Sequence, residues 1–183
     1  MRFIVGGLFV AAALVMGGCA SIPISTALQL SSLSPSSLAQ TEPSQVRVKL
    51  AVPEGYELDV ANTRLKLALT GPSGSSTGEM GLSGLGTVRE SRSAGVFSSN
   101  VPVLTYSLAL TPDGIQELKR LQRFMVANKP DKFNFSVKGP LSKAPAGARE
   151  VTFWVDLKLS LAEPFMPLIK GAKIKFEGSG ASS

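Results

Sequence analysis

The sequence predicts a mainly β protein, an antiparallel β-sandwich with one amphipathic α-helix packed on it. Two observations predict this class. Apolar residues alternate with polar or small residues in seven short stretches of the chain, which is typical of strands with one buried and one wet face. Only one stretch has helical spacing, and the strands and helices do not alternate as they do in parallel sheets.

The clearest strand is EVTFWVDLKLSL, where every second residue from Val151 to Leu161 is apolar. Thr152, Trp154, Asp156 and Lys158 fall on the opposite side. The seven predicted strands lie near residues 24–30, 46–52, 64–69, 104–110, 133–137, 151–161 and 174–176. An immunoglobulin-like arrangement of these strands is one option, by analogy alone.

One helix is predicted between the strands. Thr111-Pro112-Asp113 is a start signal, with an N-cap hydroxyl, a proline in the first turn and an early carboxylate. The apolar residues that follow at helical spacing are Ile115, Leu118, Leu121 and Met125. The pattern ends at Asn128-Lys129-Pro130. We expect the apolar stripe of this helix to lie on the sheet.

Two segments are predicted as loops. Residues 71–86 contain six glycines but lack the Gly-Lys-Ser/Thr ending of a phosphate-binding loop, so a mobile loop is expected there. Residues 139–149 form a turn-rich connection. Residues 20–44 hold eight serines and three prolines, which predicts a flexible tether that includes the short edge strand.

The N-terminus has the layout of a secretory signal peptide. Arg2 precedes an uncharged run over residues 3–18, and this run is shorter than the roughly 20 residues that a membrane-spanning helix needs. The run ends in Met16-Gly17-Gly18-Cys19, which contains the only cysteine of the chain.

This ending resembles the lipobox of bacterial (proteobacterial) lipoproteins. The rest of the chain carries no further motif of that family. In that class the thiol receives a diacylglycerol group, the signal is cut before the cysteine, and the new amine is acylated by a fatty acid such as palmitate. The resemblance implies a lipid anchor on Cys19. Since Ala20 follows instead of Asp, it also implies anchoring in the outer membrane, with the domain facing the periplasm. Several acyl chains make such a membrane anchor effectively permanent.

The sequence thus divides the chain into four parts. They are a signal peptide (1–18), a lipid-anchored tether (19–44), the β-sandwich domain (45–178) and a disordered tail (179–183).

The composition argues against an enzyme. The chain has no histidine, which excludes Ser-His-Asp and Cys-His catalysis and His-ligated zinc. Cys19 is expected to carry lipid, and no lysine follows a serine at the Ser-x-x-Lys spacing. We therefore expect no catalytic residues, no metal and no cofactor.

Basic residues gather on the polar sides of the predicted strands. The proposed face comprises Arg47, Lys49, Arg64, Lys66, Trp154 and Lys158. If these strands are neighbours, they form a cationic plate with an aromatic residue in it, suited to phosphates or carboxylates. Alternatively, these side chains only keep the strands soluble and discourage edge pairing.

A second candidate is EPFMPLIKG, residues 163–171, because Phe165, Met166 and Leu168 lie close together between two prolines. If exposed, such a loop would contact a partner or lipid. Alternatively, its side chains cover the end of the core.

Two functional hypotheses follow. The first is a non-enzymatic binding or assembly module that holds an envelope protein partner at the membrane. The alternative is a binding module for an anionic envelope component, such as lipopolysaccharide, phospholipid head groups or peptidoglycan. Nucleic acid is not expected as a partner outside the cytoplasm.

Overall fold

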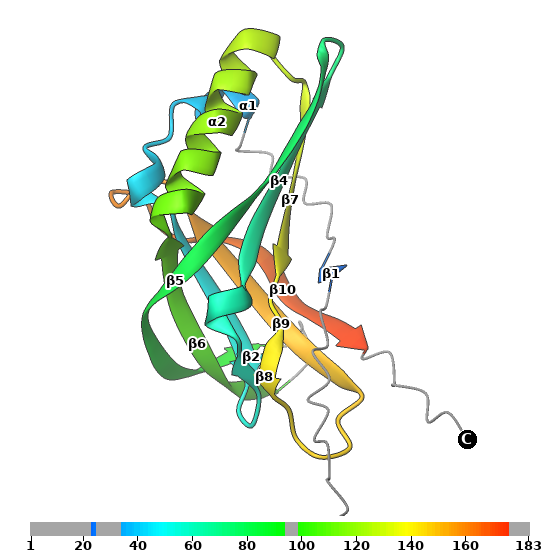
Figure 1. Ribbon diagram of the computed structural model, residues 1–183. Coiled ribbons are helices and arrows are strands. Elements are labelled where there is room, and N and C mark those ends of the chain that lie inside the picture. Colours follow the sequence, from blue (N-terminus) through cyan, green and yellow to red (C-terminus); the bar gives the residue numbers. More distant parts are fainter. Residues whose placement is uncertain (1–22, 25–33, 94–98, 176–183) are drawn as a thin grey trace, which may run out of the picture.

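The computed structural model describes residues 23–24, 34–93 and 99–175 of the chain, which is mainly β with one long helix (Figure 1). The strands are β1 (Pro23–Ile24), β2 (Arg47–Pro53), β3 (Glu57–Leu58), β4 (Arg64–Gly71), β5 (Gly74–Ser93), β6 (Asn100–Leu110), β7 (Lys132–Lys138), β8 (Leu141–Lys143), β9 (Glu150–Lys158) and β10 (Met166–Lys175). The helices are α1 (Pro35–Ala39), η1 (Pro43–Gln45), η2 (Val60–Asn62) and α2 (Pro112–Asn128). The predicted signal peptide, Cys19 and the predicted tail lie outside the described residues.

Eight strands form one curled antiparallel sheet in the order β1-β7-β4-β5-β6-β2-β9-β10. The long strand β5 belongs to both halves of this sheet, because residues 74–81 pair with β4 and residues 82–93 pair with β6. The predicted class is confirmed. The strand order differs from the immunoglobulin-like arrangement. That fold has two separate sheets, whereas here β5 connects the two halves of one sheet.

The core lies between the two halves of the sheet. Leu67 of β4, Leu108 of β6 and Phe153 of β9 belong to one hydrophobic cluster and are fully buried. Each comes from the apolar side of an alternating strand, so the period-2 pattern predicted these inward faces correctly.

Helix α2 closes the core beside β5 (Figure 1). Its predicted start is confirmed, because Thr111 Oγ1 accepts a hydrogen bond of 3.1 Å from the amide of Gly114. Its end is also as predicted, with Lys129 in the left-handed conformation after the last turn. Leu118, Leu121 and Met125 are buried in the core.

The glycine-rich segment was predicted as a loop, and this prediction is wrong. Residues 74–86 form the first part of β5. Small residues are needed there because α2 comes close to the strand. A Cβ atom on Gly78 would lie 2.9 Å from Leu121 Cδ1, and one on Gly81 would lie 2.7 Å from Thr111 Oγ1.

The folded part begins earlier than the predicted boundary at residue 45. Leu38 of α1 is buried in the core, and α1 contacts α2. The amide of Gln122 donates to the carbonyl oxygens of Leu38 at 3.0 Å and Thr41 at 2.6 Å. Further upstream, β1 pairs with β7 at one sheet edge, where an edge strand was expected, while residues 25–33 lie outside the described part.

No helix in the described part of the chain combines the length and apolar character needed to cross a membrane.

Candidate functional site

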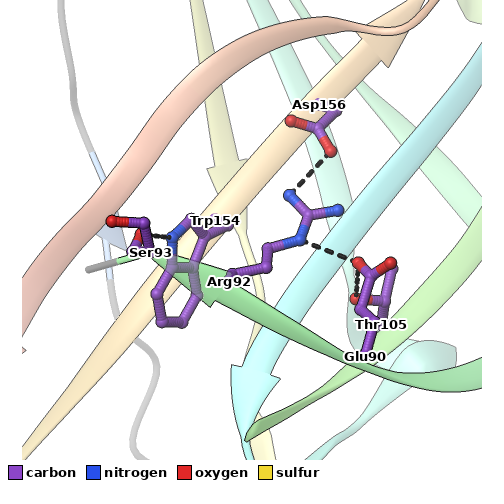
Figure 2. Close-up of polar contacts among 6 residues, drawn as sticks. All are labelled: Glu90, Arg92, Ser93, Thr105, Trp154 and Asp156. Carbon is purple, nitrogen blue, oxygen red and sulfur yellow. Dashed lines mark hydrogen bonds and ion pairs between the residues drawn. The ribbon is translucent and has the colours of Figure 1, made fainter. Parts of the chain in front are cut away.

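The end of the β5–β6 hairpin curls over the outer face of β2 and β9, the face turned away from the main core. In the sheet, β6 and β2 separate β5 from β9. Nevertheless the indole nitrogen of Trp154 on β9 donates a 2.9 Å hydrogen bond to the carbonyl oxygen of Ser93 on β5 (Figure 2). The strongly curled hairpin therefore contacts a strand that is not its neighbour.

Arg92 forms the polar part of this contact. Its Nη1 atom lies 2.8 Å from Asp156 Oδ2, and its Nε donates to Glu90 Oε1 at 2.8 Å (Figure 2). The hydroxyl of Thr105 also donates to Glu90 Oε1, at 2.7 Å. We call Glu90, Arg92, Thr105, Trp154 and Asp156 the hairpin latch, since together they tie the hairpin end to β9.

The contacts of the latch shift the pKa values of two of its residues, Glu90 and Arg92. The hydrogen bond from Thr105 holds the pKa of Glu90 below its usual 4.5; burial opposes this shift, and the positive charges of Arg92 and Lys49 add to it. Burial disfavours the charged form of Arg92, but its hydrogen bonds to Glu90 and Asp156 outweigh burial and raise its pKa. The contacts within the latch therefore favour the charged forms of Glu90 and Arg92.

Under the hairpin lies a second, small core. Trp154, Ala51 and Val103 are buried there, with Val101 packed against them. The sequence placed Trp154 on a wet face, and that prediction is wrong. Only 3% of its surface is exposed, because the curled hairpin covers this part of the outer face.

Three of the predicted basic residues come together beyond the latch. Arg47 on β2 stands directly opposite Lys158 on β9, and Lys49 stands opposite Asp156. The ammonium nitrogens of Lys49 and Lys158 lie 4.5 Å and 5.0 Å from the centre of the same ring, that of Phe165. We call Arg47, Lys49, Lys158 and Phe165 the cationic cluster.

Arg64 and Lys66 do not join this cluster. They lie on β4 in the other half of the sheet, where Lys66 is opposite Glu79. The guanidinium of Arg64 donates to the carbonyl oxygens of Ala61 and Thr63 at 2.7 and 2.8 Å. The predicted basic plate is thus split between two half-sheets, because alternation fixes which side of a strand a residue takes but not which strands are neighbours.

The predicted partner loop is largely a strand. Leu168 lies within β10 and is buried in the main core, so its side chain is not offered to a partner. Met166 begins β10 and is half-buried. Phe165 is also half-buried and forms the aromatic base of the cationic cluster.

A feature that the sequence did not reveal is the open edge of β5. In the described part of the chain, residues 82–92 pair with a strand on one side only, that of β6, and β4 ends its pairing at Gly81. Leu85 and Val88 are 59% and 53% exposed there, although they are large apolar residues. Sequence alone missed them because Leu85 lies within the glycine-rich segment and Val88 lies just after it, where the glycines hide the alternation of the strand.

Both carboxylates of the latch, Glu90 and Asp156, form ion pairs with the guanidinium of Arg92. Within the described residues, no group of three Asp, Glu, Cys or His side chains could hold a metal ion. Comparison with known protein families, with curated proteins and with solved structures finds no match to this chain, so its function has to be argued from this geometry.

Proposed function

We propose that this chain is a lipid-anchored, non-enzymatic envelope protein that binds an extended segment of a protein partner along the open edge of β5. The observation that carries the proposal is that, among the described residues, residues 82–92 pair with a strand on one side only. An unpaired strand edge offers a row of amide and carbonyl groups that a partner strand can complete.

The length and chemistry of this edge support strand addition. Residues 85–93 extend over about 30 Å, longer than a typical strand of five or six residues. Among the described residues, no hydrogen bond joins the backbone of residues 85–92 to any element other than β6. Leu85 and Val88 add apolar surface on which partner side chains can pack.

The latch supports the same proposal by fixing the edge in place. A free hairpin would lose conformational entropy on binding, whereas a hairpin already tied to β9 presents an ordered edge. The partner then replaces water at the edge without having to order the strand itself.

The anchor is the part of the proposal that comes from the sequence. Cys19 precedes the first long described segment, which begins at Ser34, so a lipid on Cys19 would keep the folded part near the membrane surface. Mass spectrometry of the protein from membranes tests this. We expect an N-terminus at Cys19 with diacylglycerol and an amide-linked fatty acid, and release into the soluble fraction for Cys19→Ser. An unmodified thiol would contradict the anchor.

The docking edge is tested by crosslinking in intact cells. A photoreactive amino acid at Thr87, which is exposed on β5, should form a discrete adduct, and Val88→Lys should abolish it. A charge at a strand edge opposes pairing with another strand. The matched control is Val126→Lys on α2, because Val126 is also an exposed valine, at 67%.

The partner identified in the adduct is then purified with the full chain for hydrogen exchange. We expect the amides of residues 85–92 to gain protection in the complex, a signature of added strand hydrogen bonds. An adduct that Val88→Lys leaves intact, or protection confined to α2, would contradict docking at the β5 edge.

A further inference from the structure

We infer that the cationic cluster is a binding site for a phosphate monoester group, at a place separate from the β5 edge. Arg47, Lys49 and Lys158 lie on adjacent strands of one half-sheet and are all half-buried. The inference does not depend on a protein partner, so it stands or falls independently of the proposed function.

The positive charges of Arg47, Lys49 and Lys158 outnumber the carboxylates near them. In the described part of the chain, none of the three forms an ion pair with a carboxylate. Asp156, the acid opposite Lys49, is already paired with Arg92. Together with Arg92, four cationic side chains share two carboxylates, Glu90 and Asp156. The surface there is therefore positive and can attract an anion.

Protection of a sheet edge against unwanted pairing does not explain why Arg47, Lys49 and Lys158 are basic. Lysines discourage unwanted pairing when they lie on edge strands. However, β2 lies between β6 and β9, and β9 lies between β2 and β10, so both are interior strands. Like charges directly opposite on neighbouring strands are destabilising, and Arg47 stands opposite Lys158. A bound anion would relieve that repulsion.

Contacts with neighbouring residues hold the side chains of the cationic cluster in position. Phe165 contacts both ammonium groups, which keeps them near each other despite their repulsion. The loop before Phe165 is fixed in turn, because Gln45 Oε1 accepts hydrogen bonds from Ser160 Oγ at 3.1 Å and from the amide of Leu161 at 3.2 Å. One side of the Arg47 guanidinium is fixed by the carbonyl oxygens of Ser44 and Val46, through Nη1. Among the described residues, no hydrogen bond uses the Nη2 or Nε atom of Arg47, so both can donate to a ligand.

The donors fit a phosphate monoester best. Such a group carries about −1.5 to −2 charges at neutral pH and has three strongly accepting oxygens. A guanidinium with two ammonium groups supplies donors from three directions, whereas a carboxylate offers one charge and a planar pair of oxygens. A terminal phosphate with similar charge and accepting oxygens occurs on monoester lipid head groups and as free inorganic phosphate, so the test distinguishes these sources.

Calorimetric titration of the detergent-solubilised full chain provides the test. The probes are inorganic phosphate, short-chain phosphatidic acid as a lipid monoester, short-chain phosphatidylglycerol as a diester, and galacturonate as a carboxylate. Saturable binding of phosphatidic acid without binding of inorganic phosphate would assign the site to a lipid head group. Binding of inorganic phosphate with similar affinity would assign it to a soluble phosphate. Both results support the inference.

The variants separate this site from general surface charge. Lys49→Gln with Lys158→Gln should weaken monoester binding by about ten-fold or more. Lys132→Gln with Lys138→Gln removes the same charge from β7, where both lysines are exposed, and should change affinity by less than about two-fold. Lys49→Arg with Lys158→Arg should keep most of the binding, which shows that a loss in the glutamine pair is not misfolding.

Three results would overturn the inference. They are the absence of saturable binding of both phosphatidic acid and inorganic phosphate, equal losses in the β2–β9 and β7 pairs, and equal affinity for galacturonate and these two phosphate probes.

Discussion

In the described part of the chain, β10 and residues 82–92 of β5 both lack a paired strand on their outer side, and these two edges are built differently. The β10 edge carries Pro167, Lys170 and Lys173, and its pairing with β9 is interrupted by two irregularities. The second half of β5 has one irregularity, between Gly84 and Gly86, and exposes Leu85 and Val88. Prolines, lysines and bulges are the devices by which proteins prevent strands from adding to an edge. The difference indicates that β10 is protected from pairing and that β5 is left available for it.

The two edges also differ in what supports them. β10 lies against the main core through Leu168 and Ile169. The end of β5 depends instead on the hairpin latch and the small core around Trp154. Damage to the latch should therefore loosen the β5 edge and leave the β10 edge much less affected.

The largest effect is expected from Trp154→Ala. It leaves a cavity in the small core and removes the hydrogen bond to Ser93, so we expect the free energy of unfolding to fall by about 3 kcal/mol. Urea denaturation measures this loss. Hydrogen exchange under folding conditions should show amides of residues 85–93 losing more protection than those of residues 166–175.

Trp154→Phe is the matched control, because it keeps an aromatic ring but lacks the indole N–H. It should cost about 1 kcal/mol, the net value of one hydrogen bond. If Trp154→Ala changed protection equally at both edges, the latch would not be what supports the β5 edge.

The Trp154 result also shows the limit of the sequence pattern. Alternation correctly placed Val151, Phe153 and Val155 on the buried face of β9, since that pattern reports which side each residue takes. It cannot report that the far side is covered as well. Trp154 is buried by a hairpin whose curvature depends on contacts distant in sequence, such as Arg92 with Asp156.

The glycine-rich part of β5 shows a second limit. Glycine is disfavoured in strands, so residues 71–86 indicated a loop. The structure requires small residues there because α2 lies against Gly78 and Gly81. The helix itself was predicted at both ends, since its cap and apolar stripe are local signals. A close contact between two elements leaves no local signal in the sequence, and the same holds for the contact between the strands of Arg47 and Lys158. For this reason only part of the candidate site was predictable from the sequence.

A smaller effect is expected from acidification of the latch. The pKa of Glu90 is lowered in the folded protein, mainly by the hydrogen bond from Thr105, so the unfolded chain binds the proton more readily. The stabilisation is therefore fully present above about pH 4.5 and is lost as the pH falls through the lower, folded-state value. Because the Glu90 side chain is 37% exposed, solvent screening keeps this contribution below about 1 kcal/mol.

Urea denaturation from about pH 6 to about pH 3 checks this prediction. Part of the decline in stability should disappear in Glu90→Gln. Glu163→Gln removes an exposed carboxylate from the β9–β10 loop and serves as the control. A wild-type profile that matches Glu90→Gln would mean that ionisation of Glu90 does not contribute to the latch.

The smallest change in stability, but a direct test of the two edges, is expected from Lys170→Thr with Lys173→Thr on β10. Both side chains are exposed, and the Lys173–Glu150 ion pair is open to solvent, so the free energy of unfolding should change by only about 0.5 kcal/mol. Self-association should nevertheless rise, because the protein would then have two edges that accept a strand. Sedimentation velocity of the full chain in detergent measures it.

Lys132→Thr with Lys138→Thr is the control for this pair, since it removes two charges from β7, a strand that pairs with β4 and β1. Equal self-association of both pairs would attribute the effect to lost charge repulsion. Association confined to the β10 pair, and reversed by adding Val88→Lys to it, would show that the new contacts join a β10 edge to a β5 edge. In that case the lysines of β10 serve to keep the β5 edge of one molecule from binding the next, so that it remains open to a different protein.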